Sequence, residues 1–161
     1  PAGKVPVLVD GSLVVTESAA IQLYLADKNP QAGFIPEAVE DRAQMYRWIF
    51  FLVTEIEQPL WRIARHTFLY PEEKRLPQDV DLARQECVEM VAVLERHMEE
   101  REFMVGDRLS VADFNAAYTL DWANEEKMLD GTPSLRKYLK SMYTRSAAPP
   151  TIAEALAALE R

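Results

Sequence analysis

The chain has 161 residues, of which 48% are hydrophobic and 27% charged, a composition typical of a globular domain with a sizeable core. Its formal net charge of −8 argues against a nucleic-acid partner, because binding to the phosphate backbone needs a basic surface. The longest apolar run, residues 48–53, is far shorter than the ~20 residues of a membrane span, and no leader is visible, so we expect no membrane partner. The single cysteine, Cys87, allows no intramolecular disulfide and favours a reducing, cytoplasmic location. Neither histidine lies in a cluster with metal-ligand spacing, so we expect no metal.

The first predicted elements are two short strands followed by a helix. Residues 7–9 and 13–15 are rich in β-branched side chains, as strands are. Asp10-Gly11 lies between them and predicts a tight hairpin turn, because glycine tolerates positive φ. Apolar residues then recur at helical spacing, and Pro30 ends this helix.

Three residues of this segment form a candidate binding site. Pro6 has no N–H to donate to a neighbouring strand, so it belongs at a strand start, an edge or a cis turn. Glu17 and Ser18 lie at the start of the helix, where free backbone N–H groups and the helix dipole favour an anion. The residues themselves leave two interpretations open: a carboxylate-binding site, or an ordinary strand-edge proline and helix N-terminus.

A linker is expected at residues 31–36, and residues 37–161 read as almost wholly helical. The first long helix carries two apolar stripes between Ala43 and Ile63. Such a helix is buried on both sides, or it faces the core on one side and a partner or cleft on the other. Pro59 is expected to kink this helix, because proline removes a backbone hydrogen bond.

A second long helix is predicted over residues 79–101. Cys87 belongs to its apolar stripe, which favours a buried core residue over a nucleophile. After the next turn, Ser110 and Asp113 have the spacing of a capping box, the most specific structural signal in the chain. Loss of such a cap costs roughly 1 kcal/mol, and more where solvent cannot replace the lost bond.

Two further helix starts follow. Thr132 is the expected N-cap of one helix, with Pro133 at its first position. Thr151 and Glu154 form a second expected capping box before a short last helix. The residues therefore predict a mostly α-helical fold, with a β-hairpin and one helix ahead of an all-helical part.

Several stretches, taken together, resemble the cytosolic glutathione transferase family, of bacterial type. They are residues 3–8, residues 16–21, residues 103–114 with the capping box, and residues 138–145. The resemblance covers essentially the whole chain. It implies a thioredoxin-like N-terminal domain followed by an all-helical domain, in a protein that is usually a homodimer.

The resemblance also implies how the chain is divided. Residues 1–30 correspond to part of the thioredoxin-like, glutathione-binding domain, residues 31–36 to a linker, and residues 37–161 to the all-α C-terminal domain. The first strand-helix-strand unit of the family's N-terminal domain is not in the sequence. That unit holds the Tyr, Ser or Cys that stabilises the glutathione thiolate, so no catalytic residue is expected in this chain, which is inactive alone or incomplete.

The resemblance assigns five residues to glutathione. Pro6 is the expected cis proline, and the backbone of Val5 binds the cysteinyl part in the manner of an added strand. Ser18 and the helix N-terminus take the γ-glutamyl carboxylate, and Glu17 takes the ammonium group. Lys4 meets the glycyl carboxylate. Glutathione is thus the implied co-substrate, with no metal.

A hydrophobic electrophile is the second implied partner. It would lie against the first long helix, where the candidates are Tyr46, Phe50, Trp61 and Arg62. The implied function is a glutathione transferase that conjugates the thiolate to such an electrophile, as in detoxification. Two alternatives remain: a non-catalytic, glutathione-transferase-like binding or dimerisation module, and a glutathione-dependent disulfide reductase or peroxidase.

Overall fold

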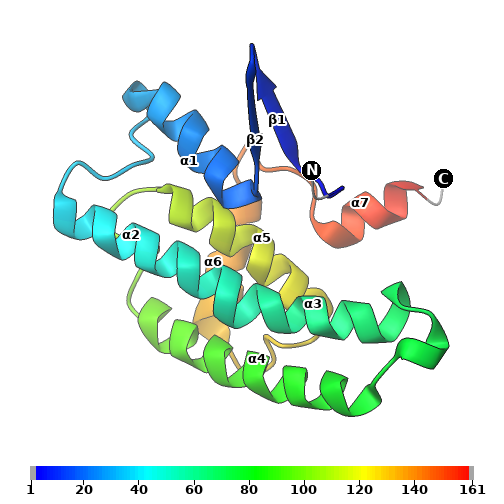
Figure 1. The fold of residues 1–161 in the computed structure, drawn as a ribbon. Helices are drawn as coiled ribbons and strands as arrows, with labels where there is room; N and C mark the ends of the chain where they lie inside the picture. The colour runs from blue at the N-terminus through cyan, green and yellow to red at the C-terminus, as the bar shows by residue number, and fades with distance from the viewer. Residues whose placement is uncertain (1–2, 160–161) are drawn as a thin grey trace.

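A β-hairpin leads into a bundle of helices in the computed structural model, which describes residues 3–159 (Figure 1). The hairpin strands are β1 (Val7–Asp10) and β2 (Leu13–Thr16), and helix α1 (Ser18–Lys28) follows directly. The larger helices of the bundle are α2 (Val39–Phe51), α3 (Gln58–Ala64), α4 (Pro77–Met98), α5 (Val111–Glu125), α6 (Pro133–Tyr143) and α7 (Ile152–Leu159). Short helical segments connect them: η1 (Pro30–Ala32), η2 (Leu52–Glu57), η3 (Arg65–Leu69) and η4 (Glu72–Lys74). The first predicted domain begins at residues 1–2 and the second ends at residues 160–161, and these four residues lie outside the described part of the chain.

The predicted hairpin is confirmed, and only one of its faces is covered by α1. The strands are antiparallel, with Val7 opposite Thr16. Asp10 faces α1, where its Oδ2 accepts a hydrogen bond from the Tyr24 hydroxyl at 2.7 Å and pairs with Lys28. Side chains alternate between the two faces of a strand, so the opposite face carries a different set. That set is exposed and consists of Val7, Val9 and Val14.

One long helical stretch, from α2 through η2 and α3 to η3, runs from Val39 to Leu69 without a break in helical backbone angles. The irregularity predicted at Pro59 takes the form of a π-helical segment, η2, immediately before α3. In a regular α-helix the proline ring would meet the carbonyl four residues earlier. The wider π-helical turn relieves this clash while the chain continues as a helix.

The two apolar stripes of this long helix have different surroundings. One stripe is in the core and is almost completely buried; its members are Met45, Ile49, Leu52, Ile56 and Ile63. In the other stripe, Tyr46, Phe50 and Val53 are exposed to solvent, whereas Leu60 is buried. Up to Val53 the long helix therefore has a single core face, and beyond it both stripes enter the core.

Helix α5 is the central element of the bundle and packs against α1, α2, α6 and α7 (Figure 1). Its predicted capping box is present: Asp113 Oδ2 accepts hydrogen bonds from Ser110 N at 2.8 Å and from Ser110 Oγ at 2.9 Å. The other oxygen, Oδ1, accepts from Met104 N and from the Tyr138 hydroxyl, both at 2.8 Å. Asp113 is fully buried, so one carboxylate joins the loop before α5, the start of α5 and α6.

The start of α6 differs from the sequence-based expectation. Thr132 occupies the N-cap position, but its hydroxyl donates back to Leu129 O at 2.7 Å. The Glu95 carboxylate of α4 caps the helix instead, accepting from Ser134 N and Leu135 N, both at 2.9 Å. The Glu95 carboxylate can cap this helix from a distance because it accepts from two free N–H groups and carries the negative charge that a helix N-terminus favours.

Helix α7 is attached to α5 at its N-terminal end. The second capping box is confirmed, with Thr151 N donating to Glu154 Oε2 at 2.9 Å and Glu154 N donating to Thr151 Oγ1 at 3.2 Å. Buried Asp121 of α5 accepts hydrogen bonds from Ile152 N at 2.7 Å and from the Tyr143 hydroxyl at 3.1 Å. These bonds hold the start of α7 beside α5.

Asp113→Ala should lower the free energy of unfolding by about 3–5 kcal/mol, because several buried donors lose their acceptor. Denaturant unfolding followed by circular dichroism measures the change. Asp107→Ala is the matched control: this exposed aspartate lies in the loop before the same cap, and its loss should cost less than about 0.5 kcal/mol. A loss below about 1 kcal/mol for Asp113→Ala would contradict the central role of this carboxylate.

Candidate functional site

The predicted glutathione-binding residues gather at the open end of the hairpin. The Val5–Pro6 peptide bond is cis and lies one residue before β1. Val7 pairs with Thr16 at this end of the hairpin, so the cis Val5–Pro6 bond and the Glu17–Ser18 junction lie next to one pair of bonded strand residues. The four residues of this bond and this junction are exposed. The structure therefore brings together the two segments that the sequence singled out separately.

Glu17 and Ser18 form a sharp junction between β2 and α1. Glu17 has φ 70° and ψ 118°, a positive φ that is uncommon for a residue other than glycine. Such a conformation is retained where the surroundings demand it, often at a binding site. Ser18 is the first residue of α1, and no side chain caps this helix at Glu17. The first N–H groups of α1 and the Ser18 hydroxyl together suit a carboxylate.

Glu57, the last residue of η2, is a half-buried acidic residue of the long helix. Burial raises the pKa of the Glu57 carboxyl above its ordinary value, and the negative charge of Glu17 raises it further. Trp61, one helical turn later, donates a hydrogen bond from Nε1 to Glu57 Oε1 at 3.3 Å.

Three aromatic side chains continue the surface around Glu57. The rings of Trp61 and Trp122 meet edge to face, with centroids 5.1 Å apart and an angle of 89° between planes. Tyr118 of α5 is 52% exposed, and its pKa is raised by burial of its hydroxyl and by the charges of Glu57 and Asp121. We call Glu57, Trp61, Tyr118 and Trp122 the aromatic-acidic surface.

The predicted acceptor-binding residues do not form one group. Trp61 belongs to the aromatic-acidic surface, whereas Tyr46 and Phe50 are exposed earlier in the same long helix, on α2. Sequence analysis did not identify Glu57 or Tyr118. The sequence pattern could have indicated Glu57, because it continues the exposed stripe of Tyr46, Phe50 and Val53 at helical spacing. No comparable pattern marks Tyr118 of α5.

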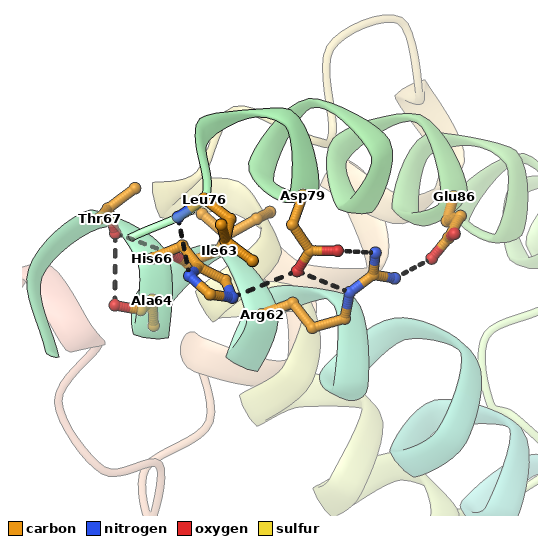
Figure 2. Close-up of polar contacts among 8 residues, drawn as sticks. All are labelled: Arg62, Ile63, Ala64, His66, Thr67, Leu76, Asp79 and Glu86. Carbon is orange, nitrogen blue, oxygen red and sulfur yellow. Dashed lines mark hydrogen bonds and ion pairs between the residues drawn. The ribbon is translucent and has the colours of Figure 1, made fainter. Parts of the chain in front are cut away.

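Arg62, one of the residues predicted to bind the acceptor, is engaged in ion pairs with α4 (Figure 2). Its Nη2 lies 2.6 Å from Asp79 Oδ1, its Nε donates to Asp79 Oδ2 at 3.2 Å, and its Nη1 pairs with Glu86. His66 joins the same network through Asp79 Oδ2 at 3.4 Å, and its Nδ1 accepts from Leu76 N at 3.2 Å. These contacts fasten α3 and η3 to the start of α4.

Cys87 is a core residue, as predicted. Its side chain is fully buried within α4, and burial raises the pKa of its thiol to about 12. A thiol that stays protonated and inaccessible is not a nucleophile. Within residues 3–159, no group of three or more His, Cys, Asp or Glu side chains is arranged to hold a metal ion. Over the same residues, no helix has the length and apolar character needed to cross a membrane.

Comparison with known proteins identifies the family. The sequence model of the glutathione S-transferase C-terminal domain matches residues 55–146, more than half of the chain. The chain belongs to the glutathione transferase family. The model of the glutathione S-transferase N-terminal domain matches residues 1–27. The predicted family and mostly helical fold are thereby confirmed.

Individual relatives include a glutathione S-transferase and an elongation factor. A glutathione S-transferase of Arabidopsis thaliana is 30% identical over 118 residues, which cover 70% of this chain and 54% of that protein. Elongation factor 1-gamma of Rattus norvegicus is 30% identical over 141 residues, covering 85% of this chain and 30% of that protein. The chain thus spans about half, or less, of these curated relatives.

Solved structures of the family superpose on almost the whole chain. A glutathione transferase from Phanerochaete chrysosporium gives a TM-score of 0.84 at 26% identity, covering 99% of this chain and 76% of its own. The same protein crystallised with 1-(S-glutathionyl)-2,4-dinitrobenzene gives a TM-score of 0.81 at 27% identity, covering 97% and 74%.

The ion pairs of Arg62 make the free energy of unfolding depend on pH in the acidic range. The hydrogen bonds and charge of Arg62 hold the pKa of Asp79 below its ordinary value. A lowered pKa in the folded state stabilises the protein above the unfolded pKa of about 3.9, and this contribution is lost as the pH falls through the folded pKa. Arg62→Met should therefore destabilise the protein at pH 7, and its difference from the wild type should shrink between about pH 4 and pH 2.

Urea unfolding at a series of pH values measures this difference. Arg75→Met is the matched control, because Arg75 lies in the same region but donates to a backbone oxygen, that of Tyr70, at 2.7 Å. Its effect should not change with pH over this range. An Arg62→Met effect that stays constant down to about pH 2 would show that Asp79 is not the linked group.

Proposed function

We propose that this protein binds glutathione as a co-substrate and transfers its thiolate to a hydrophobic electrophile. The observation that carries the proposal is that the paired ends of β1 and β2 bring the cis Val5–Pro6 peptide and the uncapped N-terminus of α1, which begins at Ser18, to the same end of the hairpin. An exposed backbone next to a strand can pair with a peptide, and an uncapped helix N-terminus can bind a carboxylate. Glutathione, a tripeptide that carries carboxylates at both ends, offers both groups.

In this proposal each part of glutathione has a protein partner. The backbone of Val5 pairs with the cysteinyl residue, which points the thiol away from the hairpin toward the bundle. Ser18 and the N–H groups of α1 take the γ-glutamyl carboxylate, and Glu17 takes the neighbouring ammonium group. Lys4, exposed two residues before the cis proline, takes the glycyl carboxylate.

The reaction is attack of the glutathione thiolate on an electrophilic carbon. A carbon–sulfur bond forms, and the electrophile's leaving group or displaced electron pair receives the charge. A lowered thiol pKa makes thiolate available at neutral pH. None of the described residues is assigned to lowering it, since Ser18 belongs to the carboxylate site and Cys87 to the core. The ligand of the Phanerochaete chrysosporium structure, a glutathionyl dinitrobenzene, is a conjugate of this kind.

We further propose that the protein is a homodimer. The exposed stripe of Tyr46, Phe50 and Val53 on one long helix is the kind of apolar face that a second subunit covers. A non-catalytic role would use the same face. The similarity to elongation factor 1-gamma, over 85% of this chain, favours that second candidate function.

Ser18→Ala should weaken glutathione binding by ~1.5–3 kcal/mol, or roughly 10- to 150-fold, because one charge-assisted hydrogen bond is lost. Isothermal titration calorimetry with glutathione measures the affinity. Ser12→Ala in the hairpin turn is the matched control and should bind as the wild type does. Equal affinity of Ser18→Ala and the wild type would rule out the proposed carboxylate site.

Phe50→Glu should convert the protein from a dimer to a monomer, because a charge placed in an apolar interface is left without a partner. Light scattering at micromolar concentration gives the mass. Leu156→Glu on α7, a position that is 56% exposed, should remain dimeric. A monomeric wild type, or a dimeric Phe50→Glu variant, would contradict the proposed interface.

A further inference from the structure

The aromatic-acidic surface is assembled from two parts of the chain. Glu57 and Trp61 come from the long helix, and Tyr118 and Trp122 come from α5. The hydrogen bond from Trp61 to Glu57 and the edge-to-face contact of the two tryptophans connect three of the four residues, and Tyr118 lies one helical turn before Trp122 on α5. Helix α5, which carries Tyr118 and Trp122, packs against α1, whose N-terminus belongs to the proposed glutathione site, so the surface and that site are on neighbouring elements.

The charges that reach this surface are all negative. The pKa of Glu57 is raised by burial and by Glu17, and that of Tyr118 by burial, Glu57 and Asp121. The pKa of Tyr143, next to Asp121, is likewise raised by burial and by neighbouring negative charge. Among the described residues, no Lys or Arg contributes an opposing charge to any of the three groups.

Two observations single out Glu57 as the carboxylate that a ligand would meet. Arg62, the cation nearest to Trp61 in the sequence, is paired with Asp79 on α4. Asp121 is buried and already accepts two hydrogen bonds from α7 and Tyr143. Glu57 is only half-buried and accepts one hydrogen bond from the described residues, whereas a carboxylate has room for more.

We propose that this surface selects uncharged or cationic aromatic electrophiles and rejects anionic ones, with Glu57 as the residue that determines the selection. The inference rests on the proposed function and names its acceptor class. An aromatic ring gains contact with Trp61 and Tyr118, which are exposed enough to receive it. A cationic substituent is attracted both by the ring faces and by the Glu57 carboxylate. An anionic substituent at the same place is repelled, and water screens that repulsion poorly at a half-buried group.

The experiment compares three ligands of one shape and different charge: 4-nitrobenzylammonium, 4-nitrobenzyl alcohol and 4-nitrobenzoate. Each is titrated into the protein, and binding is followed by quenching of tryptophan fluorescence and by calorimetry. The wild type should bind the cation and the neutral compound at least about tenfold more tightly than the anion. In Glu57→Gln, which keeps an oxygen for the Trp61 hydrogen bond, the three affinities should lie within about threefold of one another.

Two further variants separate charge from structure. Glu57→Asp keeps the carboxylate and should retain the preference. Glu55→Gln, an exposed glutamate on the same segment that accepts from the Thr54 hydroxyl, should behave as the wild type. A wild type that binds the anion as tightly as the neutral compound, an unchanged preference in Glu57→Gln, or saturation by none of the three ligands would overturn the proposal.

A parallel titration with glutathione distinguishes this proposal from the proposed function. Glutathione binding without discrimination among the three nitroaromatic ligands refutes the role of Glu57 alone. Discrimination without glutathione binding refutes the transferase proposal and leaves the charge selectivity of the surface in place.

Discussion

The buried carboxylate of Asp113 is the interaction on which the arrangement of the helical bundle depends. Its two oxygens accept hydrogen bonds from the loop before α5, from the cap of α5 and from Tyr138 of α6. Because α5 contacts α1, α2, α6 and α7, the position of its first turn is transmitted to most of the molecule. The same helix carries Tyr118 and Trp122, so a bond that is purely structural also positions the candidate acceptor surface.

The long helix from Val39 to Leu69 serves several purposes along its length. One stripe fills the core, and the first turns expose Tyr46 and Phe50 to a proposed partner. Beyond the π-helical segment η2, Glu57 and Trp61 belong to the aromatic-acidic surface. An inserted π-helical turn changes the angular phase of the residues that follow it, so one continuous helix can present different faces at its two ends.

The candidate glutathione site depends on backbone geometry more than on side-chain chemistry. The cis Val5–Pro6 bond, the positive φ of Glu17 and the uncapped start of α1 are all properties of the main chain. In the proposed complex side chains add a hydroxyl from Ser18, a positive charge from Lys4 and a negative charge from Glu17. Such a combination suits a ligand that is itself a short peptide with charged ends.

The sequence by itself determined what depends on near neighbours. Asp10-Gly11 predicted the hairpin turn, and the Ser110–Asp113 spacing predicted a cap, because these bonds join residues within a few positions of each other. Only the tertiary structure decided which distant groups meet. Glu95 caps α6 from 39 positions away, Arg62 pairs with Asp79 of α4, and Trp61 meets Trp122 of α5. No local pattern encodes such pairs, because helix packing, not chain spacing, sets the distance between them.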